Sequence, residues 1–332
     1  MTAPHLDILG IGNAIVDVIS RAEPALLAAR GLTPGEMRLI DTAEAGSLYD
    51  AMGPGIESSG GSAANTCAVA AAIGARVGYL GKVADDALGT VFAHDLRVGG
   101  IHFPTAPAPN PASGGLPTAR CLILVTPDGQ RTMSTYLGAC TTFGPADIDE
   151  AGVRGAAVTY MEGYLFDPPA AQEAFRTAAA IARDAGREVA ISLSDAFCVG
   201  RHRAAFRDFV AKHADILFAN EDEVLSLYEV DSFEAALEAV RRDGIKVAAL
   251  TRGGAGSVVV ADGQAHPVAA APATVVDTTG AGDAYAAGFL AAHVRGLPPA
   301  ERGRWGGIAA AEVIGHLGAR PQADLKALLG LG

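Results

Sequence analysis

The chain has 332 residues, 50% of them hydrophobic, and a formal net charge of −12. This length suits one large α/β domain or two ordinary domains with a sizeable core. The acidic balance without a basic stripe excludes a nucleic-acid or acidic-membrane partner, because the phosphates of either would find too little positive charge. No apolar run could cross a membrane and no basic leader opens the chain, so we expect a cytoplasmic protein.

The cysteines indicate neither a metal site nor a disulfide framework. They are widely spaced and form no CxxC pair: Cys67, Cys121, Cys140 and Cys198. The eight histidines include no HExxH motif. We therefore expect each cysteine to be a small buried side chain.

The first half of the chain mixes predicted strands with helices. The apolar run LDILGIG, at 6–12, ends in glycine and is typical of a buried parallel strand. Further strands are predicted at 37–41, 76–83, 121–125 and 131–137, and helices at 65–73 and 87–99. The last two strands form a hairpin, because Pro127-Asp128-Gly129 between them favours a turn. The proline-rich stretch at 104–117 reads as a mobile loop.

The second half alternates strands with helices. Strands are predicted at 157–164, 188–194, 215–220, 247–253 and 256–263, and helices at 172–186, 203–213, 233–244, 283–296 and 304–318. This rhythm predicts an α/β fold, a Rossmann-like, mostly parallel sheet with helices on both faces. Two segments break the rhythm, near 14–50 and 104–140, and read as meandering β-structure that forms a small sheet over one end of the main domain.

The stretch at 277–290, DTTGAGDAYAAGFL, carries the strongest chemical signal. We expect a strand at 273–277, then a turn in which the N–H groups of Gly280, Ala281 and Gly282 converge on an anion at a helix N-terminus. Asp283, on the first helical turn, suits a hydroxyl that must lose a proton to attack that anion, so it reads as a general base. The alternative is a first-turn charge behind a glycine cap.

Four ordered motifs resemble the ribokinase-like (PfkB) carbohydrate kinase family. They are GGSAAN at 60–65, NEDE at 220–223, TRGGAG at 251–256 and the stretch at 277–290, and they span nearly the whole chain. The resemblance implies a single kinase domain over 1–332, Rossmann-like, with a small β-sheet lid formed by about 14–50 and 104–140. It also implies transfer of the ATP γ-phosphate to a primary hydroxyl, a reaction in which positioning and charge neutralisation dominate.

The resemblance assigns roles to matching residues of this chain. Asp283 becomes the catalytic base, and the amides of Gly280, Ala281 and Gly282 the anion hole. Asp277 and Thr279 match positions tied to a monovalent cation, which implies K⁺ as an activator.

The same family likeness assigns the ATP side of the site. Asn220 and Glu223 would order Mg²⁺ and its waters, with Glu223 acting through a water. The residues that would border ATP are Thr251, Arg252, Gly253 and Gly256.

The acceptor side starts from Asp17, in GNAIVD after the first strand. A carboxylate there can accept hydrogen bonds from two vicinal ribose hydroxyls, and Asn65 can donate and accept at the same ring. In the family resemblance Gly60 and Gly61 belong to the sugar-holding element. A lone acid at a strand end is otherwise an ordinary surface charge.

Within the family, GNAIVD, SGGSAANT and QRTMSTYLGA most resemble the adenosine kinases, which implies the 5′-hydroxyl of a ribonucleoside, above all adenosine, as acceptor. Met133 and Leu137 would then face the purine and Arg131 the phosphates, unless 131–137 is an ordinary amphipathic hairpin. Asn13 either touches the base or caps a turn. Tyr164 and Phe166 supply an aromatic face or belong to the core.

Two other functions stay open. One is a kinase of a free sugar or sugar acid, such as ribose, fructose or 2-keto-3-deoxygluconate, which the apolar strand at 133–139 disfavours. The other is a nonenzymatic sugar- or nucleotide-binding regulator, which would have no need of Asp283 as a base. GIGNAI lacks the third glycine of a dinucleotide loop. We expect a monomer or a homodimer.

Overall fold

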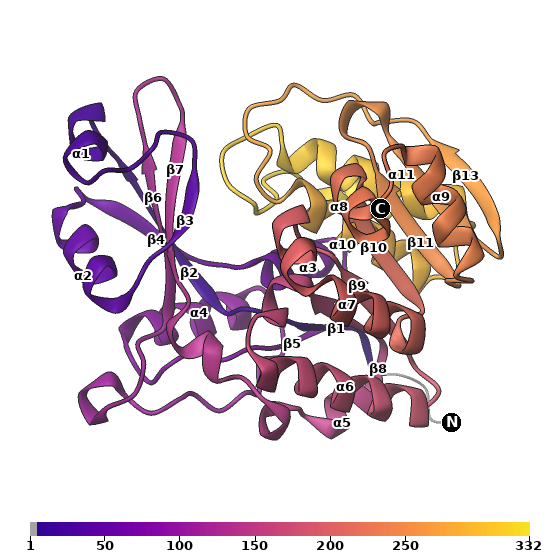
Figure 1. Cartoon of the computed structure of the whole chain (residues 1–332), viewed down its shortest axis with the longest axis horizontal. Coiled ribbons are helices and arrows are strands. Elements are labelled where there is room, and N and C mark those ends of the chain that lie inside the picture. Colours follow the sequence, from indigo (N-terminus) through magenta and orange to yellow (C-terminus); the bar gives the residue numbers. More distant parts are fainter. Residues whose placement is uncertain (1–4) are drawn as a thin grey trace.

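The computed structural model describes residues 5–332, which form two sheets (Figure 1). The larger sheet has eight strands in the order β13-β12-β11-β10-β9-β8-β1-β5. They are β1 (Leu6–Ile11), β5 (Val77–Leu80), β8 (Ala156–Glu162), β9 (Glu188–Ser192), β10 (Ile216–Asn220), β11 (Val247–Thr251), β12 (Ser257–Ala261) and β13 (Gln264–Val268). Neighbouring strands are parallel from β5 to β11 and antiparallel from β11 to β13.

Helices cover both faces of the large sheet, so successive side chains of one strand enter different cores. In β1, Ile8 packs into one core and Leu9 into the other. The first core includes α3 (Ser62–Ala72), α10 (Ala281–His293) and α11 (Pro299–Val313). The second includes α5 (Glu150–Gly155), α6 (Pro169–Asp184), α7 (Ala196–His213), α8 (Glu221–Tyr228) and α9 (Phe233–Arg242). Burial on both faces explains why these strands read as continuous apolar runs.

The smaller sheet has five strands in the order β3-β7-β6-β2-β4. They are β2 (Ile15–Arg21), β3 (Met37–Leu39), β4 (Gly55–Gly60), β6 (Ala119–Val125) and β7 (Arg131–Tyr136). On one face Val16 and Val18 join the core with Leu27 of α1 (Pro24–Ala29) and Leu48 of α2 (Thr42–Ala51). Figure 1 shows α1 and α2 on the outer side of this sheet. The other face is open toward the large sheet.

The chain passes between the two sheets four times within residues 5–332. Residues 12–14 lead from β1 of the large sheet into β2, and Gly61 alone separates β4 from α3. Two further helices complete the structure: α4 (Ala87–Val98), which packs on β4 and β2, and α12 (Leu325–Leu328), which packs on α11. The segment that places α3 is thus continuous with an edge strand of the smaller sheet.

The predicted α/β fold, with its mostly parallel sheet, covering helices and second small sheet, is confirmed. The strand predicted at 273–277 is wrong. This segment runs past the end of α11, where the N–H of Val276 donates to the Ile314 carbonyl at 2.8 Å. The side chains of Val275 and Val276 are 61% and 55% exposed, so no sheet neighbour covers them. Strand β4 was not predicted from the sequence.

The cysteine prediction is confirmed, since all four cysteines are buried and free. Within residues 5–332 no helix has the length and apolar character that a membrane span requires.

Candidate active site

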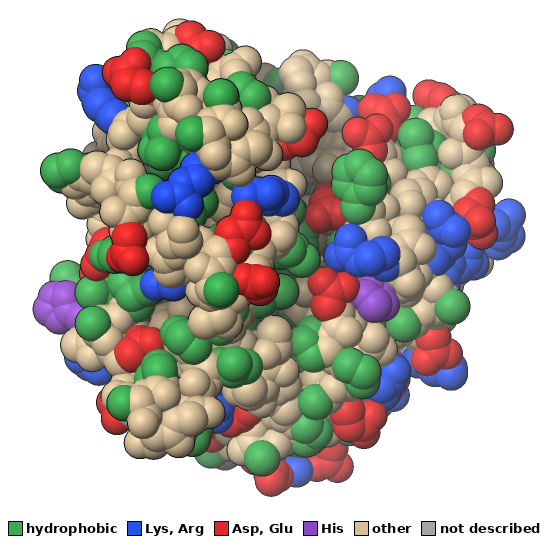
Figure 2. Space-filling view, turned by 60° about the vertical axis from the view of Figure 1, so that its left-hand side comes forward, with side chains coloured by type: hydrophobic (Ala, Val, Ile, Leu, Met, Phe, Trp, Pro, Cys, Tyr) green, Lys and Arg blue, Asp and Glu red, His purple; other side chains and the backbone are tan. Residues whose placement is uncertain are grey.

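The open face of the small sheet and one edge of the large sheet enclose a cavity of about 790 Å³. Figure 2 shows the surface hollowed between the lobe that holds the small sheet and the rest of the molecule. The last residues of β8, β9, β10 and β11 line it: Glu162, Ser192, Asn220 and Thr251. The cavity therefore lies at the carboxyl ends of parallel strands, where α/β sheets bind their ligands.

Asp283 is held at this cavity by two side chains of α3. Ser62 Oγ donates to Oδ1 of Asp283 at 2.6 Å, and Asn65 Nδ2 donates to Oδ2 at 3.1 Å. The carboxylate keeps one side open to the cavity, yet dense packing around it raises the pKa of Asp283, and the two hydrogen bonds oppose that rise. An oriented carboxylate with a raised pKa is well suited to accept a proton. Ser62 was not predicted, although it lies within the GGSAAN motif.

The turn before Asp283 presents backbone N–H groups to the cavity. Gly280 has φ +77°, and a Cβ there would lie 2.5 Å from Ala319 Cβ, so only glycine fits. The Ala281 N–H donates to Thr278 O at 3.2 Å and is partly used by the turn itself. No acceptor among residues 5–332 is found for the Gly282 N–H, which stands at the N-terminus of α10. The Gly280 N–H likewise has no acceptor within the described residues, so two of the three amides predicted to bind an anion, those of Gly280 and Gly282, are free to do so.

The sugar-side residues are brought together by close backbone approaches. A Cβ on Gly60 would lie 2.4 Å from Oδ2 of Asp17, and a Cβ on Gly61, at φ +89°, would lie 2.2 Å from the Asn13 carbonyl oxygen. The glycine pair therefore lets β4 pass against Asp17 and Asn13. Burial, opposed by Arg320 and Arg131, raises the pKa of Asp17 to about 6. Asn13, Asp17, Gly61 and Asn65 all line the cavity, and Gly60 supports it from behind.

Glu162 is a buried carboxylate at the end of β8 that the sequence analysis missed. It accepts hydrogen bonds from Asn13 Nδ2 at 2.9 Å and from the Ala63 N–H, on the first turn of α3, at 2.8 Å. Burial raises the pKa of Glu162 to about 7, and these donors oppose the rise. Glu162 thus fixes both Asn13 and the helix that orients Asp283. The sequence signal that could have identified Glu162 is an acidic residue at the end of an otherwise apolar strand.

On the other side of Asp283, Asn220 and Glu223 form a reciprocal cap at the start of α8. Asn220 Oδ1 accepts the Glu223 N–H at 2.9 Å, while Asn220 N and Nδ2 donate to the two Glu223 oxygens at 2.9 and 2.7 Å. Both residues and Thr251 line the cavity. Burial raises the pKa of Glu223 to about 7.

The rest of the TRGGAG turn does not reach the cavity wall. Arg252 pairs with Glu221 at 3.1 Å and lies over the Phe233 ring. Gly253 begins an exposed 3₁₀ turn, and Gly256, at φ +87°, fits closely against Val268 O. The glycine at 256 is therefore explained by the packing of β12 against β13.

Apolar side chains cover the small-sheet wall of the cavity. They are Ile15, Met37, Leu39, Ile123, Met133 and Leu137. Opposite them, at the start of α7, Phe197 lines the cavity with its side chain 83% exposed. Tyr164 also lines the cavity, whereas Phe166 is buried in the α6–α7 core, stacked on Phe206 with ring centroids 4.1 Å apart. Met37, Leu39 and Phe197 were not predicted, because isolated apolar residues give no such signal.

Arg131 connects the two sheets at the edge of the site. Its Nη1 pairs with Asp277 Oδ2 and also donates to Thr279 Oγ1 at 3.1 Å. Asp277 accepts the Gly318 N–H at 2.9 Å and the Thr279 N–H at 3.0 Å as well. Although burial raises the pKa of Asp277, these hydrogen bonds and Arg131 outweigh it and lower the pKa. Thr279 lines the cavity, while Arg131 and Asp277 lie just outside it.

Comparison with protein families supplies the identity that this geometry suggests. Residues 36–325 match the model described as pfkB family carbohydrate kinase. The chain belongs to this family. It is therefore an ATP-dependent phosphotransferase with a hydroxyl group as acceptor.

Proteins similar to this chain carry the names of kinases with different acceptors. An ATP-dependent ribose-1-phosphate kinase from Halopiger xanaduensis is 34% identical over 71% of this chain and 73% of its own. A solved adenosine kinase from Sinorhizobium meliloti is 48% identical with a TM-score of 0.89, covering 98% of this chain and 99% of its own. A probable sugar kinase from Rhizobium etli is 45% identical with a TM-score of 0.90, covering 99% and 98%. The ribokinase-like fold that the sequence predicts is thus confirmed.

Proposed function

We propose that this pfkB-family kinase transfers the γ-phosphate of ATP to the 5′-hydroxyl of a ribonucleoside, and that adenosine is the preferred acceptor. The observation that carries the proposal is the cavity itself. It combines the oriented carboxylate of Asp283 with a second carboxylate, Asp17, and an apolar wall opposite Phe197. A ribose needs the polar partners, and a purine needs the apolar surface. The 48% identity to a solved adenosine kinase supports the same acceptor.

In the proposed mechanism the chain binds, orients and moves one proton. Asp17 and Asn65 hold the ribose hydroxyls, which brings the 5′-hydroxyl to Asp283. Asp283 accepts the hydroxyl proton as the oxygen attacks the γ-phosphorus, and the bond between that phosphorus and the β,γ-bridging oxygen breaks, so that ADP leaves with the electron pair. The N–H groups of Gly280 and Gly282, at the positive end of α10, donate to oxygens of the transferred phosphoryl group, and Ala281 shapes the turn.

We propose that Mg²⁺ accompanies ATP and is met by Glu223 through water. Each Glu223 oxygen already accepts one N–H from Asn220, which leaves a lone pair for a hydrating water and little room for direct coordination. This donor arrangement fits an ion that keeps most of its waters. When bound, Mg²⁺ neutralises phosphate charge.

We also propose K⁺ as an activator at Asp277 and Thr279. The Asp277 carboxylate has two N–H donors and the Arg131 guanidinium around it, so it fits a monovalent cation only where Arg131 withdraws. These residues therefore support a cation site at which the Arg131 guanidinium competes with the ion for the Asp277 carboxylate.

A kinase of a sugar phosphate or free sugar is the second candidate, favoured by the 34% identical ribose-1-phosphate kinase. A phosphate on C1 of ribose would need cations where adenosine needs apolar surface. The two arginines of the cavity wall are engaged elsewhere, Arg38 with Glu44 and Arg201 with Asp167. This pairing supports the nucleoside.

The deciding experiment measures ADP release from Mg-ATP in the presence of K⁺ with nucleosides, ribose 1-phosphate and free sugars as acceptors. We expect turnover with adenosine and loss of about 10²–10⁴-fold in kcat for Asp283→Asn, with adenosine binding retained. Turnover only with ribose 1-phosphate or a free sugar would leave the kinase chemistry in place and refute the nucleoside assignment. A retained kcat in Asp283→Asn would remove it as the base.

A further inference from the structure

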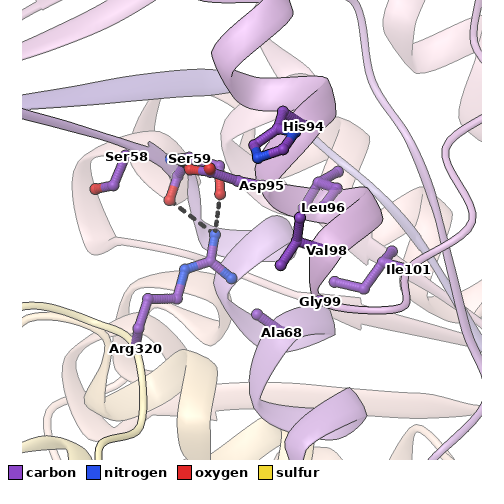
Figure 3. A pocket seen from close by; sticks show the side chains of 10 residues that line it. All are labelled: Ser58, Ser59, Ala68, His94, Asp95, Leu96, Val98, Gly99, Ile101 and Arg320. Carbon is purple, nitrogen blue, oxygen red and sulfur yellow. Dashed lines mark hydrogen bonds between the residues drawn. The ribbon is translucent and has the colours of Figure 1, made fainter.

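Arg320 joins the C-terminal loop to the point where the two sheets meet. It follows α11, and its guanidinium points at the junction of β4 and α3 (Figure 3). Nη1 donates to the Ala64 carbonyl at 3.0 Å, and Nη2 donates to Ser59 O at 2.8 Å and Ser59 Oγ at 3.0 Å. One side of Arg320 borders a cavity of about 350 Å³ on the outer side of the junction. The Arg320 side chain thus connects Ser59, the β4 residue before the glycine pair, to Ala64 in the first turn of α3.

Helix α4 binds the junction from a second side. The Ser59 N–H donates to Asp95 Oδ2 at 2.7 Å, so Ser59 is held between Asp95 and Arg320. The same junction carries Ser62 and Asn65, which bond Asp283. Fixing Ser59 and Ala64 therefore fixes the residues that orient Asp283.

The charge of Arg320 has no direct ionic partner. Within residues 5–332 its hydrogen bonds go to two carbonyl oxygens and one hydroxyl, and no carboxylate pairs with it. Burial lowers the pKa of the Arg320 guanidinium, and the carboxylates that oppose this through space are Asp17, Asp95 and Asp283. A desolvated cation is costly unless nearby anions compensate it, and the two site carboxylates are such anions.

We propose that Arg320 is a positioning residue for phosphoryl transfer: it fixes the β4–α3 junction and supplies the fixed positive charge that keeps Asp283 and Asp17 ionised. Only the expected change in the kinetics of phosphoryl transfer rests on the proposed function. The effect of Arg320 on the ionisation of two carboxylates holds for any acceptor.

The other charged and titratable groups around these carboxylates do not replace Arg320. The groups near Asp283 are Tyr160 and Glu162 of β8, Tyr164 after it, Glu223 of α8 and Asp17 of β2. The groups near Asp17 are Arg131 of β7, Cys121 of β6 and Asp283. Apart from Arg131, which is engaged with Asp277, none is a cation, so Arg320 is the main positive charge facing both carboxylates.

The kinetic test compares pH profiles of kcat/KM from pH 5 to 9 for four proteins: wild type, Arg320→Lys, Arg320→Gln and Ser59→Ala. Ser59→Ala is the matched control, because it removes one hydrogen bond of Arg320 and leaves its charge. For Arg320→Gln we expect the acid limb to move toward neutral pH, with about tenfold lower kcat/KM at pH 6 relative to pH 8 than in wild type. Arg320→Lys and Ser59→Ala should keep the wild-type limb. An unmoved limb in Arg320→Gln, or equal movement in Ser59→Ala, would overturn the charge role.

A stability measurement tests the same proposal without any substrate. Carboxyl groups whose pKa rises on folding make the protein less stable as pH increases through that range. Loss of the Arg320 charge raises the folded-state pKa of these carboxyl groups further and so widens the pH range over which stability is lost. The Tm of Arg320→Gln should therefore fall more between pH 5 and 8 than that of Arg320→Lys. Equal falls would refute the proposal. Absence of turnover in wild type with every acceptor would instead count against the proposed function.

A double variant covers the case in which Arg320→Gln does not fold. Arg320→Gln combined with Asp17→Asn removes one desolvated carboxylate together with the cation that compensates it. We expect this double variant to recover folding relative to Arg320→Gln alone, as coupling between the two charges requires. No recovery would mean that Arg320 acts through its hydrogen bonds only.

Discussion

Arg131 and Asp277 are 146 residues apart in the chain, yet they pair between the small sheet and the loop before α10. Arg131 opens β7, and Asp277 opens the segment that carries Asp283. The pair connects the small sheet to the loop that carries the proposed anion hole, and it also occupies the carboxylate at which we propose K⁺.

Competition between Arg131 and K⁺ for Asp277 gives the first prediction. We expect ADP release by the wild type to rise with K⁺ at constant ionic strength, with tetramethylammonium as the inert substitute. In Arg131→Ala the half-saturating K⁺ concentration should fall, because a competing guanidinium is gone, while kcat falls through loss of positive charge near the phosphates. A wild type indifferent to K⁺ would dismiss the cation site.

The role of Asp17 in holding the ribose gives a prediction about KM. Asp17→Asn should raise the KM for adenosine about 10–100-fold, because hydrogen bonds to a carboxylate become hydrogen bonds to a neutral amide. The kcat should change far less. The preference for adenosine over 2′-deoxyadenosine should shrink in the same variant. Steady-state kinetics with both acceptors checks this, and an unaltered KM would take Asp17 out of the site.

Phe197 and Phe166 form a matched pair for testing the apolar wall. Phe197→Ala should raise the KM for adenosine about tenfold and leave thermal stability nearly unchanged, since the ring is 83% exposed. Phe166→Leu should lower the free energy of unfolding by about 1–3 kcal/mol and leave the KM alone, since its ring is 1% exposed in the core. If Phe197→Ala binds adenosine like wild type, the base does not contact α7.

The buried carboxylate of Glu162 makes stability depend on pH. Its pKa is about 7 in the folded protein against 4.5 for the free group, so between these values the folded state holds a proton that the unfolded chain has released. The stability present below pH 4.5 is therefore lost as the pH rises through about 7. Glu162→Gln mimics the protonated side chain and should reduce the fall in Tm between pH 5 and 8 by roughly 3 °C or more. An identical fall in both proteins would show that Glu162 does not titrate in this range.

Local chemistry was readable from the sequence, and long-range assembly was not. The glycine turns beside Asp283 and Asp17 can be predicted from the sequence, because few other residues adopt their backbone geometry or allow such close approach of the chain. Glu162 and Arg320 went unnoticed because their importance arises from β8 and the C-terminal loop meeting α3, which no short motif encodes. Strand β4, GIESSG, has little β-propensity and forms because β2 offers it a ladder.

The two hydrogen bonds on Asp283 also bear on what happens when ATP is bound without an acceptor. Water is then the available nucleophile. Ser62 and Asn65 each use one lone pair of a carboxylate oxygen, so the lone pairs left to take a proton point in a fixed direction. An acceptor held by Asp17 and Asn65 is expected to place its hydroxyl along that direction, whereas a water molecule would have to find it by diffusion. Under the proposed function, the side chains that recognise the acceptor would therefore also restrain futile hydrolysis of ATP.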